Sequence, residues 1–280
     1  MTTKNPDRRK RGIWRGLGLR LVFYYLLYAS LAFFLQGHLL FPGQRRRAAP
    51  DAPWPVGRTE HWKIETEAAR VPAALLTPQN VAPRIVVMVG HGNAELIEDW
   101  IDLAELLTGE GAAVLLVEFP GYGNAGGKPS RRTLDAVFLR AREMIEERSD
   151  LRHLPVVGLG RSIGSGPVCE LARRKLLERV ALMAPFDSLD SLVRRMALPA
   201  RLLRSRYDNK QALREFEGPL WIIHGAKDRV IPAAHSHRLA ADFPRAQLQI
   251  TESGHNDLLW SGSEWWPGMM DFLFAGSLEE

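Results

Sequence analysis

The sequence contains almost no cysteine. Its 280 residues include a single one, Cys169, which cannot form a disulfide within the chain. A lone thiol also excludes every zinc site that needs several cysteine ligands. Glycine and proline are at ordinary levels, hydrophobic residues make up 46% of the chain and charged residues 25%. These values are typical of a globular protein and exclude collagen-like, low-complexity and wholly disordered chains.

The body of the chain lacks the excess of basic residues that nucleic-acid binding requires. Residues 1–50 carry ten Lys and Arg and one acid, Asp7, whereas residues 51–280 carry 27 basic and 31 acidic residues. The net charge of +5 therefore comes from the N-terminal segment. Because a nucleic-acid-binding domain is basic on its own folded surface, we expect no nucleic-acid partner.

One long uncharged hydrophobic run lies near the N-terminus. After a basic segment at 1–20, the 21 residues from Leu21 to Phe41 contain no Asp, Glu, Lys or Arg. As a helix they would extend about 30 Å, which is enough to cross the hydrocarbon core of a bilayer. We therefore expect an uncleaved membrane-anchoring helix over 21–41. A buried or amphipathic helix of a soluble domain and a cleaved signal peptide are the alternatives.

The charges that flank this run predict its orientation. Seven basic residues precede it and three, Arg45, Arg46 and Arg47, follow it. The positive-inside rule then places the N-terminus in the cytoplasm and the body on the extracytoplasmic side of an inner or plasma membrane, although the trailing arginines weaken the asymmetry. Residues 42–59, rich in Pro and Arg, are expected to form a linker.

The body, residues 60–280, alternates short apolar segments with segments of helical periodicity. Strands are predicted over His61–Thr66, Ala73–Thr77, Arg84–Val89, Ala113–Glu118, Pro155–Leu159, Val180–Ala184, Leu220–His224 and Gln247–Thr251. Helices are predicted over Leu96–Leu107, Arg132–Arg148, Ile163–Leu177, Ala233–Ala241 and Glu264–Phe274. Two opening strands followed by repeated strand–helix units predict an α/β fold with a mostly parallel sheet and helices on both faces. Ligand chemistry in such a sheet belongs at the C-terminal ends of the strands.

A candidate nucleophile follows the strand predicted over Pro155–Leu159. Residues 160–164, Gly-Arg-Ser-Ile-Gly, match the pattern G-x-S-x-G between a predicted strand and a predicted helix, the context in which this pattern forms a nucleophile elbow around Ser162. A Cβ at Gly160 or Gly164 is expected to clash with the neighbouring helix and strand. A glycine-rich turn with a bystander serine is the alternative. A phosphate-binding loop is disfavoured because its Lys-Ser/Thr ending is missing.

A candidate base and a candidate carboxylate follow two later strands. Asp228 comes after the apolar segment 220–224, and His255 comes after the segment 247–251. The chain order Ser162, Asp228, His255 is the order expected of a hydrolase elbow. In such a triad His255 would take the proton of Ser162, and Asp228 would orient the imidazole.

Four other residues compete for the roles of base and carboxylate: His91, His224, Asp187 and Asp257. His224 precedes a glycine at the end of its strand, a position more typical of a structural residue. Asp257 is only two residues from His255 and is poorly placed to brace its ring. Acyl transfer also needs donors for the oxyanion. We assign these to the backbone N–H groups of Asn93, in the glycine-flanked turn after IVVMV, and of Ile163. An ordinary turn at Asn93 is the alternative.

These motifs together resemble the α/β-hydrolase superfamily, and within it a membrane-anchored, serine-aminopeptidase-like group that includes the α/β-hydrolase-domain depalmitoylases. The resemblance covers roughly residues 60–275, and the LLFPG segment after the apolar run is similar to that group's exit from its anchor. The segments that carry it are HGNAE, EFPGYGNAGGKPS, GLGRSIGSG, APFDSL, IIHGAKDRVIP and SGHNDL. It implies an eight-stranded sheet, a triad of Ser162, Asp228 and His255, and no metal or organic cofactor.

Two features set this chain apart from the group. In the group, an acidic residue usually follows the Pro-Ser that ends the GYG segment, whereas Arg131 follows Ser130 here. The N-terminal cap of the following helix is therefore expected to differ from that of the group. The cysteine-rich N-terminus of the animal depalmitoylases is missing as well, so their substrate is not carried over. Arg161, beside the candidate nucleophile, could bind a substrate carboxylate or pair with a local acid.

The fold that this resemblance implies often inserts a cap between two strands, and residues 187–217 occupy such a position. They mix Leu, Val and Met with arginines at 194, 195, 201, 204 and 206. This basic amphipathic pattern predicts a small lid that meets acyl chains or an anionic membrane surface. A surface helix with a solvated arginine face is the alternative.

The sequence therefore predicts a membrane-anchored serine hydrolase that cleaves ester or thioester bonds of small, acyl or lipid-like substrates without a cofactor. A peptidase of the same fold is the second hypothesis. A binding protein that retains the fold without its activity is the third.

Overall fold

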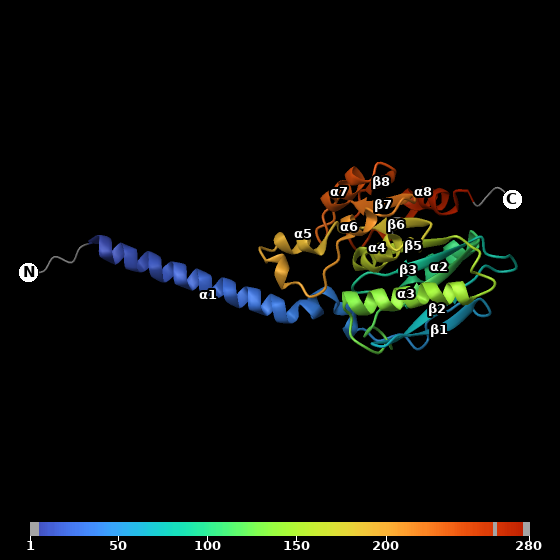
Figure 1. The fold of residues 1–280 in the computed structure, drawn as a ribbon, viewed down its shortest axis with the longest axis horizontal. Helices are drawn as coiled ribbons and strands as arrows, with labels where there is room; N and C mark the ends of the chain where they lie inside the picture. Colours follow the sequence, from blue (N-terminus) through green and yellow to red (C-terminus); the bar gives the residue numbers. More distant parts are fainter. Residues whose placement is uncertain (1–5, 260–261, 277–280) are drawn as a thin grey trace, which may run out of the picture.

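The computed structural model describes residues 6–259 and 262–276 of the chain. Within them, eight strands form one sheet in the order β1-β2-β4-β3-β5-β6-β7-β8 (Figure 1). The strands are β1 (Thr59–Glu65), β2 (Arg70–Leu76), β3 (Ile85–Gly90), β4 (Ala112–Val117), β5 (Val156–Arg161), β6 (Arg179–Met183), β7 (Leu220–Gly225) and β8 (Ala246–Thr251). Strand β2 runs antiparallel to both of its neighbours, β1 and β4. The strands β4, β3, β5, β6, β7 and β8 run parallel to one another. The predicted mostly parallel sheet is confirmed.

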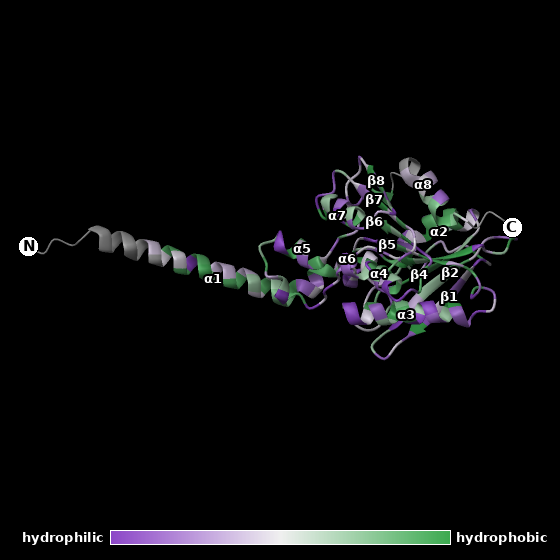
Figure 2. Ribbon diagram, turned by 45° about the horizontal axis from the view of Figure 1, so that its top comes forward, coloured by the Kyte–Doolittle hydropathy of each residue, from purple (hydrophilic) through white to green (hydrophobic). Residues whose placement is uncertain are grey.

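Helices cover both faces of the sheet because its central strands are apolar on both sides. Every residue of β3 is buried, and its alternate side chains belong to different cores. Met88 packs toward α3 and α4, whereas Val87 packs toward α2 and α8. Figure 2 shows the hydrophobic colour concentrated along these strands. The helices of the body are α2 (Ile101–Gly109), α3 (Arg131–Glu147), α4 (Ser165–Arg173), α5 (Leu189–Arg194), α6 (Asn209–Leu213), α7 (Ala234–Asp242) and α8 (Gly262–Phe274).

Two predicted helices differ from the structure at their ends. The helix predicted over Leu96–Leu107 is divided into a 3-10 helix, η2 (Ile97–Trp100), and α2. The helix predicted over Ile163–Leu177 starts as η3 (Ser162–Gly164), continues as α4 and ends at Arg173. It ends early because Lys175 adopts a left-handed conformation with φ of 58°, which closes the helix.

The N-terminal helix α1 (Pro6–Leu40) is longer than the apolar run, because the basic residues before it continue the same helix. The part from Gly16 to Leu40 is long and apolar enough to cross a membrane. Figure 1 shows α1 extending away from the body. Most of its described apolar side chains are exposed, Phe34 and Leu19 to 72% each. This exposure does not fit a core helix of a soluble domain.

The residues directly after α1, the first part of the predicted linker, are docked on the body. Phe41 is buried in the main core, and a 3-10 helix, η1 (Pro42–Arg45), follows it. Gly43 lies so close to the ring of Tyr122 that a Cβ would collide with it. Arg46 then forms an ion pair with Asp99. The predicted linker is therefore packed along much of its first part.

Residues 187–217, which we call the cap segment, contain α5, a 3-10 helix η4 (Ala200–Leu202) and α6. The part from α5 to η4 holds the C-terminal half of α1. Three side chains of α1 donate hydrogen bonds to its backbone carbonyls: Tyr25 to Ala197 (3.1 Å), Tyr28 to Met196 (2.8 Å) and Gln36 to Leu202 (3.0 Å).

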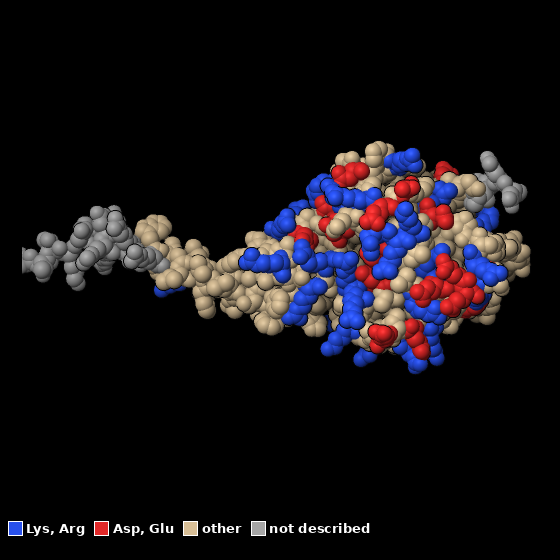
Figure 3. All heavy atoms as spheres, in the orientation of Figure 1, with Lys and Arg blue, Asp and Glu red and all other residues tan. Residues whose placement is uncertain are grey.

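The cap segment also carries exposed basic side chains. The five arginines of its first part, at 194, 195, 201, 204 and 206, are all exposed. Figure 3 shows basic side chains gathered over the end of the body from which α1 emerges. Arg204 stacks on the ring of Phe33 in α1 at 4.3 Å from its centroid. The apolar helix therefore leaves the body through a basic rim.

Candidate active site

Ser162 lies in a tight turn between β5 and α4. Its φ is +51°, in the left-handed region that a residue with a side chain rarely adopts. A Cβ on Gly160 would lie 2.7 Å from the Cα of Ser165, and a Cβ on Gly164 would collide with the carbonyl of Gly90 in β3. The two glycines thus let the helix and the neighbouring strand approach the serine, as the sequence pattern indicated.

The structure brings His255 and Asp228 to this serine. Nε2 of His255 lies 3.2 Å from Oγ of Ser162, and Nδ1 lies 2.6 Å from Oδ2 of Asp228. The three residues are 4%, 6% and 8% exposed for Ser162, Asp228 and His255. They come from the C-terminal ends of β5, β7 and β8. This arrangement suits an imidazole that donates from Nδ1 to the carboxylate and accepts the serine proton at Nε2.

Asp228 is held as a carboxylate by its surroundings. Burial would raise the pKa of this carboxyl, but the hydrogen bonds from His224, His255 and the backbone of Ile231 outweigh burial and hold the pKa well below its usual range. Oδ1 accepts the backbone N–H groups of Val230 and Ile231 at 2.8 Å each, which leaves Oδ2 for the histidines. An ionised, fixed carboxylate is what the orienting role requires.

His224 also lies next to this carboxylate, but both of its ring nitrogens are hydrogen-bonded to other groups. Its Nε2 lies 2.7 Å from the carbonyl oxygen of Ile231 and 3.2 Å from Oδ2 of Asp228. Its Nδ1 lies 2.6 Å from Oγ of Ser236. With both ring nitrogens occupied and no exposed surface, His224 supports the turn that carries Asp228.

His91 and Asp257, two further candidates for the base and the carboxylate, make other contacts. His91 is buried 2.8 Å from Glu118 and stacks on Phe119. Asp257 accepts the backbone N–H of Gly254 at 2.9 Å, inside the loop that carries the candidate base. Neither interaction involves Ser162.

Asp187, after β6, belongs to another buried cluster. It contacts Nδ1 of His235 at 2.8 Å and Nε of Arg238 at 2.5 Å. Burial would raise the pKa of Asp187, but the hydrogen bonds from His235, Arg238 and Ser191 hold it well below its usual range. Asp187 therefore has the electrostatic character of a triad acid but a different histidine beside it.

The two backbone groups assigned to the oxyanion lie after neighbouring strands. Asn93 follows β3 and Ile163 follows β5, and these strands pair in parallel, with Gly90 opposite Gly160. The carbonyl of Asn93 accepts hydrogen bonds from the backbone of Gly43 (3.0 Å) and the hydroxyl of Tyr122 (2.8 Å). Gly43, in the docked segment after α1, thus helps to fix the peptide group between Asn93 and Ala94, which adjoins the one that carries the N–H of Asn93.

Arg161 is a site residue whose role the sequence left open. It is 4% exposed, its Nη1 forms an ion pair with Glu95, and its Nη2 donates to the backbone carbonyl of His255 at 2.6 Å. Burial lowers the pKa of the guanidinium to about 10. Glu95 in turn accepts the backbone N–H of Gly92 at 2.6 Å and the indole N–H of Trp100 at 3.0 Å. Arg161 therefore pairs with a local acid and links two loops of the site.

A large apolar groove of about 730 Å³ lies beside this site. We call it the helix–cap groove. It is lined by residues of α1 between 28 and 40, residues of the cap segment between 192 and 203, Asn93, and part of the turn 229–232.

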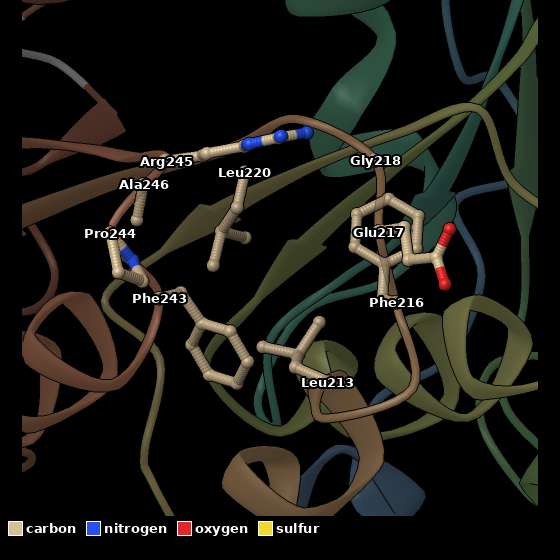
Figure 4. A pocket seen from close by; sticks show the side chains of 9 residues that line it. All are labelled: Leu213, Phe216, Glu217, Gly218, Leu220, Phe243, Pro244, Arg245 and Ala246. Atoms are coloured by element: carbon tan, nitrogen blue, oxygen red, sulfur yellow. The ribbon is translucent and has the colours of Figure 1, made fainter.

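A second, smaller hollow of about 370 Å³ lies at the opposite end of the sheet (Figure 4). It is lined by Leu220 and Ala246, the first residues of β7 and β8, and by Phe216 and Phe243. The triad candidates follow the last residues of these strands, so this hollow is remote from them.

No family profile matches the chain. Over 176 residues it is 33% identical to an uncharacterized protein of Mycobacterium tuberculosis, a match that covers 61% of this chain and 63% of that protein. Over 211 residues it is 27% identical to α/β-hydrolase domain-containing protein 17C of Xenopus tropicalis, covering 71% of this chain and 65% of the relative. The matches span less than two thirds of either relative.

Solved structures match over more of the chain. An α/β-hydrolase from Vibrio vulnificus has a TM-score of 0.69 at 17% identity, covering 86% of this chain and 93% of that one. The esterase Pf2001 of Pyrococcus furiosus has a TM-score of 0.67 at 18% identity, covering 81% and 96%. The chain has an α/β-hydrolase fold. The resemblance seen in the sequence and the fold class expected from it are confirmed.

Helix α3 has an N-terminal cap although Arg131 replaces the acidic residue expected after Ser130. Ser130 accepts the backbone N–H of Thr133 and forms a capping box with it, and α3 begins at Arg131, one residue before its predicted start. Arg131 instead reaches Asp135 and the backbone carbonyl of Arg206 in the cap segment. Within the described residues of this fold, no group of three or more His, Cys, Asp or Glu side chains is arranged to hold a metal ion.

Proposed function

We propose that this α/β-hydrolase-fold protein is a membrane-anchored serine hydrolase that cleaves esters or thioesters of acyl, lipid-like substrates. The observation that carries the proposal is the buried relay from Ser162 to His255 (3.2 Å) and Asp228 (2.6 Å) on a strained elbow. The names of the hydrolase-domain relative and of the esterase structure support hydrolysis as the reaction class.

In the proposed mechanism Nε2 of His255 takes the hydroxyl proton as Oγ of Ser162 attacks the acyl carbonyl. The backbone N–H groups of Asn93 and Ile163 stabilise the tetrahedral oxyanion. His255 then returns the proton to the leaving alcohol or thiol, and an acyl-enzyme remains. Water, activated by the same base, releases the carboxylic acid and restores the serine. Asp228 keeps the imidazole in the productive tautomer throughout.

A small fluorophosphonate probe tests this proposal, because it labels only an activated serine. We expect the wild type to be labelled and Ser162→Ala to remain unlabelled. Equal labelling of both proteins, or labelling of neither, would overturn the proposal. A panel of p-nitrophenyl esters beside aminoacyl p-nitroanilides then separates an esterase from a peptidase, while a binding protein that only retains the fold would turn over neither.

The anchor is part of the proposal and has its own test. Leu26 and Leu27 are exposed on α1, 57% and 46%, and do not line the helix–cap groove. The double substitution Leu26→Arg and Leu27→Arg places two charges in the apolar run, which costs about 5–7 kcal/mol for insertion. We expect the wild type to stay in membranes washed with carbonate and the variant to be released. A variant retained like the wild type would show that α1 is not the anchor.

A further inference from the structure

The helix–cap groove has an end beside the proposed catalytic residues. Its lining includes Asn93, whose backbone N–H is the proposed oxyanion donor, and Val230, whose backbone N–H is bonded to Oδ1 of Asp228. A substrate chain in the groove would therefore lead to the place where an acyl carbonyl must lie for attack by Ser162.

The other end of the groove opens along α1. From Leu40 to Tyr28 the groove spans thirteen residues of this helix, a rise of about 18 Å. This is the length of a long-chain fatty acyl group. Beyond Tyr28 the exposed apolar side chains of α1 continue through Tyr24 and Phe23 to Leu21. The groove is thus continuous with the surface that the proposed anchor presents to lipid.

Two polar groups of the groove wall, the side chain of Gln36 and the carbonyl of Asn93, are already hydrogen-bonded within the protein. Gln36 binds the carbonyl of Leu202 and the backbone N–H of Arg204, and the carbonyl of Asn93 is occupied by Gly43 and Tyr122. A peptide in this groove would leave its own buried N–H and C=O groups unpaired, which is unfavourable. A hydrocarbon chain has no such groups.

We propose that the helix–cap groove binds the acyl chain of a long-chain ester or thioester that enters from the bilayer along α1. The membrane helix is then one wall of the substrate site as well as an anchor. This inference rests on the proposed hydrolase function. It adds the place where the acyl chain of the substrate binds and the feature that selects the length of that acyl chain. The exposed guanidinium groups of Arg195 and Arg229 in the lining are available to an anionic headgroup at the rim.

The test fills the groove from α1 without touching the catalytic residues. Ala32 lines the groove, whereas Ser30 lies two residues away, is exposed and does not line it. In the full-length protein in mixed micelles, kcat/KM is measured for p-nitrophenyl palmitate and p-nitrophenyl butyrate. We expect Ala32→Trp to lower the palmitate-to-butyrate ratio at least about tenfold, because most methylenes lose their site. Ser30→Trp should keep the wild-type ratio.

A second variant fills the groove from the opposite wall. Leu198→Trp, in the cap segment, should lower the ratio in the same way, so the result does not depend on how α1 tolerates tryptophan. Labelling by the small fluorophosphonate shows which variants keep a competent serine. If labelled Ala32→Trp and Leu198→Trp keep the wild-type ratio, the groove inference is wrong while the hydrolase proposal stands. If the wild type is not labelled, the hydrolase proposal itself fails.

Discussion

The guanidinium of Arg161 holds the backbone of His255: Nη2 donates to the carbonyl oxygen of that residue at 2.6 Å. The same side chain forms an ion pair with Glu95, which binds the backbone N–H of Gly92 in the loop after β3. The residue before the proposed nucleophile therefore connects the loop of the proposed base with the loop of the proposed oxyanion donor. We therefore expect Arg161 to act on the proposed site through these two loops, as a positioning residue.

Arg161→Met should lower kcat about 10- to 100-fold with little change in KM, because small displacements of a base are costly. It should also lower the free energy of unfolding by about 3 kcal/mol, since Glu95 loses its cation in a mostly buried position. Steady-state kinetics below the melting temperature separate the two effects. Arg161→Lys, which can still pair with Glu95, should recover stability more than kcat. A wild-type kcat in folded Arg161→Met would show that this link does not position the base.

Asp228→Asn should lower kcat by about 10⁴-fold while the protein stays folded, because the amide favours the wrong imidazole tautomer. Asp187→Asn is the matched control, since it removes another buried carboxylate that follows a strand. The pKa of each carboxyl is held below its usual range, so each contributes stability that is complete at neutral pH and is lost as the pH falls below about 4. Asp187→Asn should therefore lower the melting temperature at pH 7 and leave kcat nearly unchanged. The opposite pattern would assign the catalytic carboxylate to Asp187.

Asp135→Asn should stabilise the protein at alkaline pH. Burial raises the pKa of Asp135 to about 6, against the partial compensation of the hydrogen bond from Tyr207. The folded state therefore binds this proton more tightly than the unfolded state, and the wild type loses stability as the pH rises from about 4 to 6. The variant does not lose this stability, so relative to the wild type we expect it to be more stable by about 3 kcal/mol at pH 8 and little different at pH 4. Denaturant unfolding at both pH values measures it, and a gain that is equal at both would exclude ionisation as the cause.

Tyr122→Phe should lower kcat about three- to tenfold, because the hydroxyl that fixes the carbonyl of Asn93 at 2.8 Å is lost. Tyr207→Phe is the control. Its hydroxyl is equally buried but donates to Asp135 at 2.7 Å, away from the proposed oxyanion site. We expect the control to lose stability and to keep kcat. Equal kcat values for the two variants would mean that the bond from the Tyr122 hydroxyl to the Asn93 carbonyl does not position the neighbouring N–H of Asn93.

The sheet and the meeting of the three triad candidates could be predicted because they depend on local patterns. Apolar segments such as the one around Val87 indicated each strand, and parallel strands bring their C-terminal ends to one edge. Ser162, Asp228 and His255 each follow such an end, so their proximity needed no knowledge of side-chain packing.

The contacts of Arg161 and of α1 could not be predicted, because each depends on partners far apart in the chain. Nothing local distinguishes Glu95 from other acids as the partner of Arg161. Tyr25 and Tyr28 fit a membrane interface in sequence, yet their hydroxyl groups bond to a cap segment about 170 residues later. The composition of residues 42–59 indicated a linker and gave no sign that Gly43 would pack on Tyr122.

The thiol of Cys169 is fully buried, and burial raises its pKa, so it is shielded from alkylating reagents that need an accessible thiolate. The native protein should therefore react little with thiol-specific reagents. One cysteine introduced at an exposed position of the body would react with a membrane-impermeant maleimide only from the compartment that it faces. Labelling of that cysteine in intact cells would therefore show on which side of the membrane the body lies, without a fused tag.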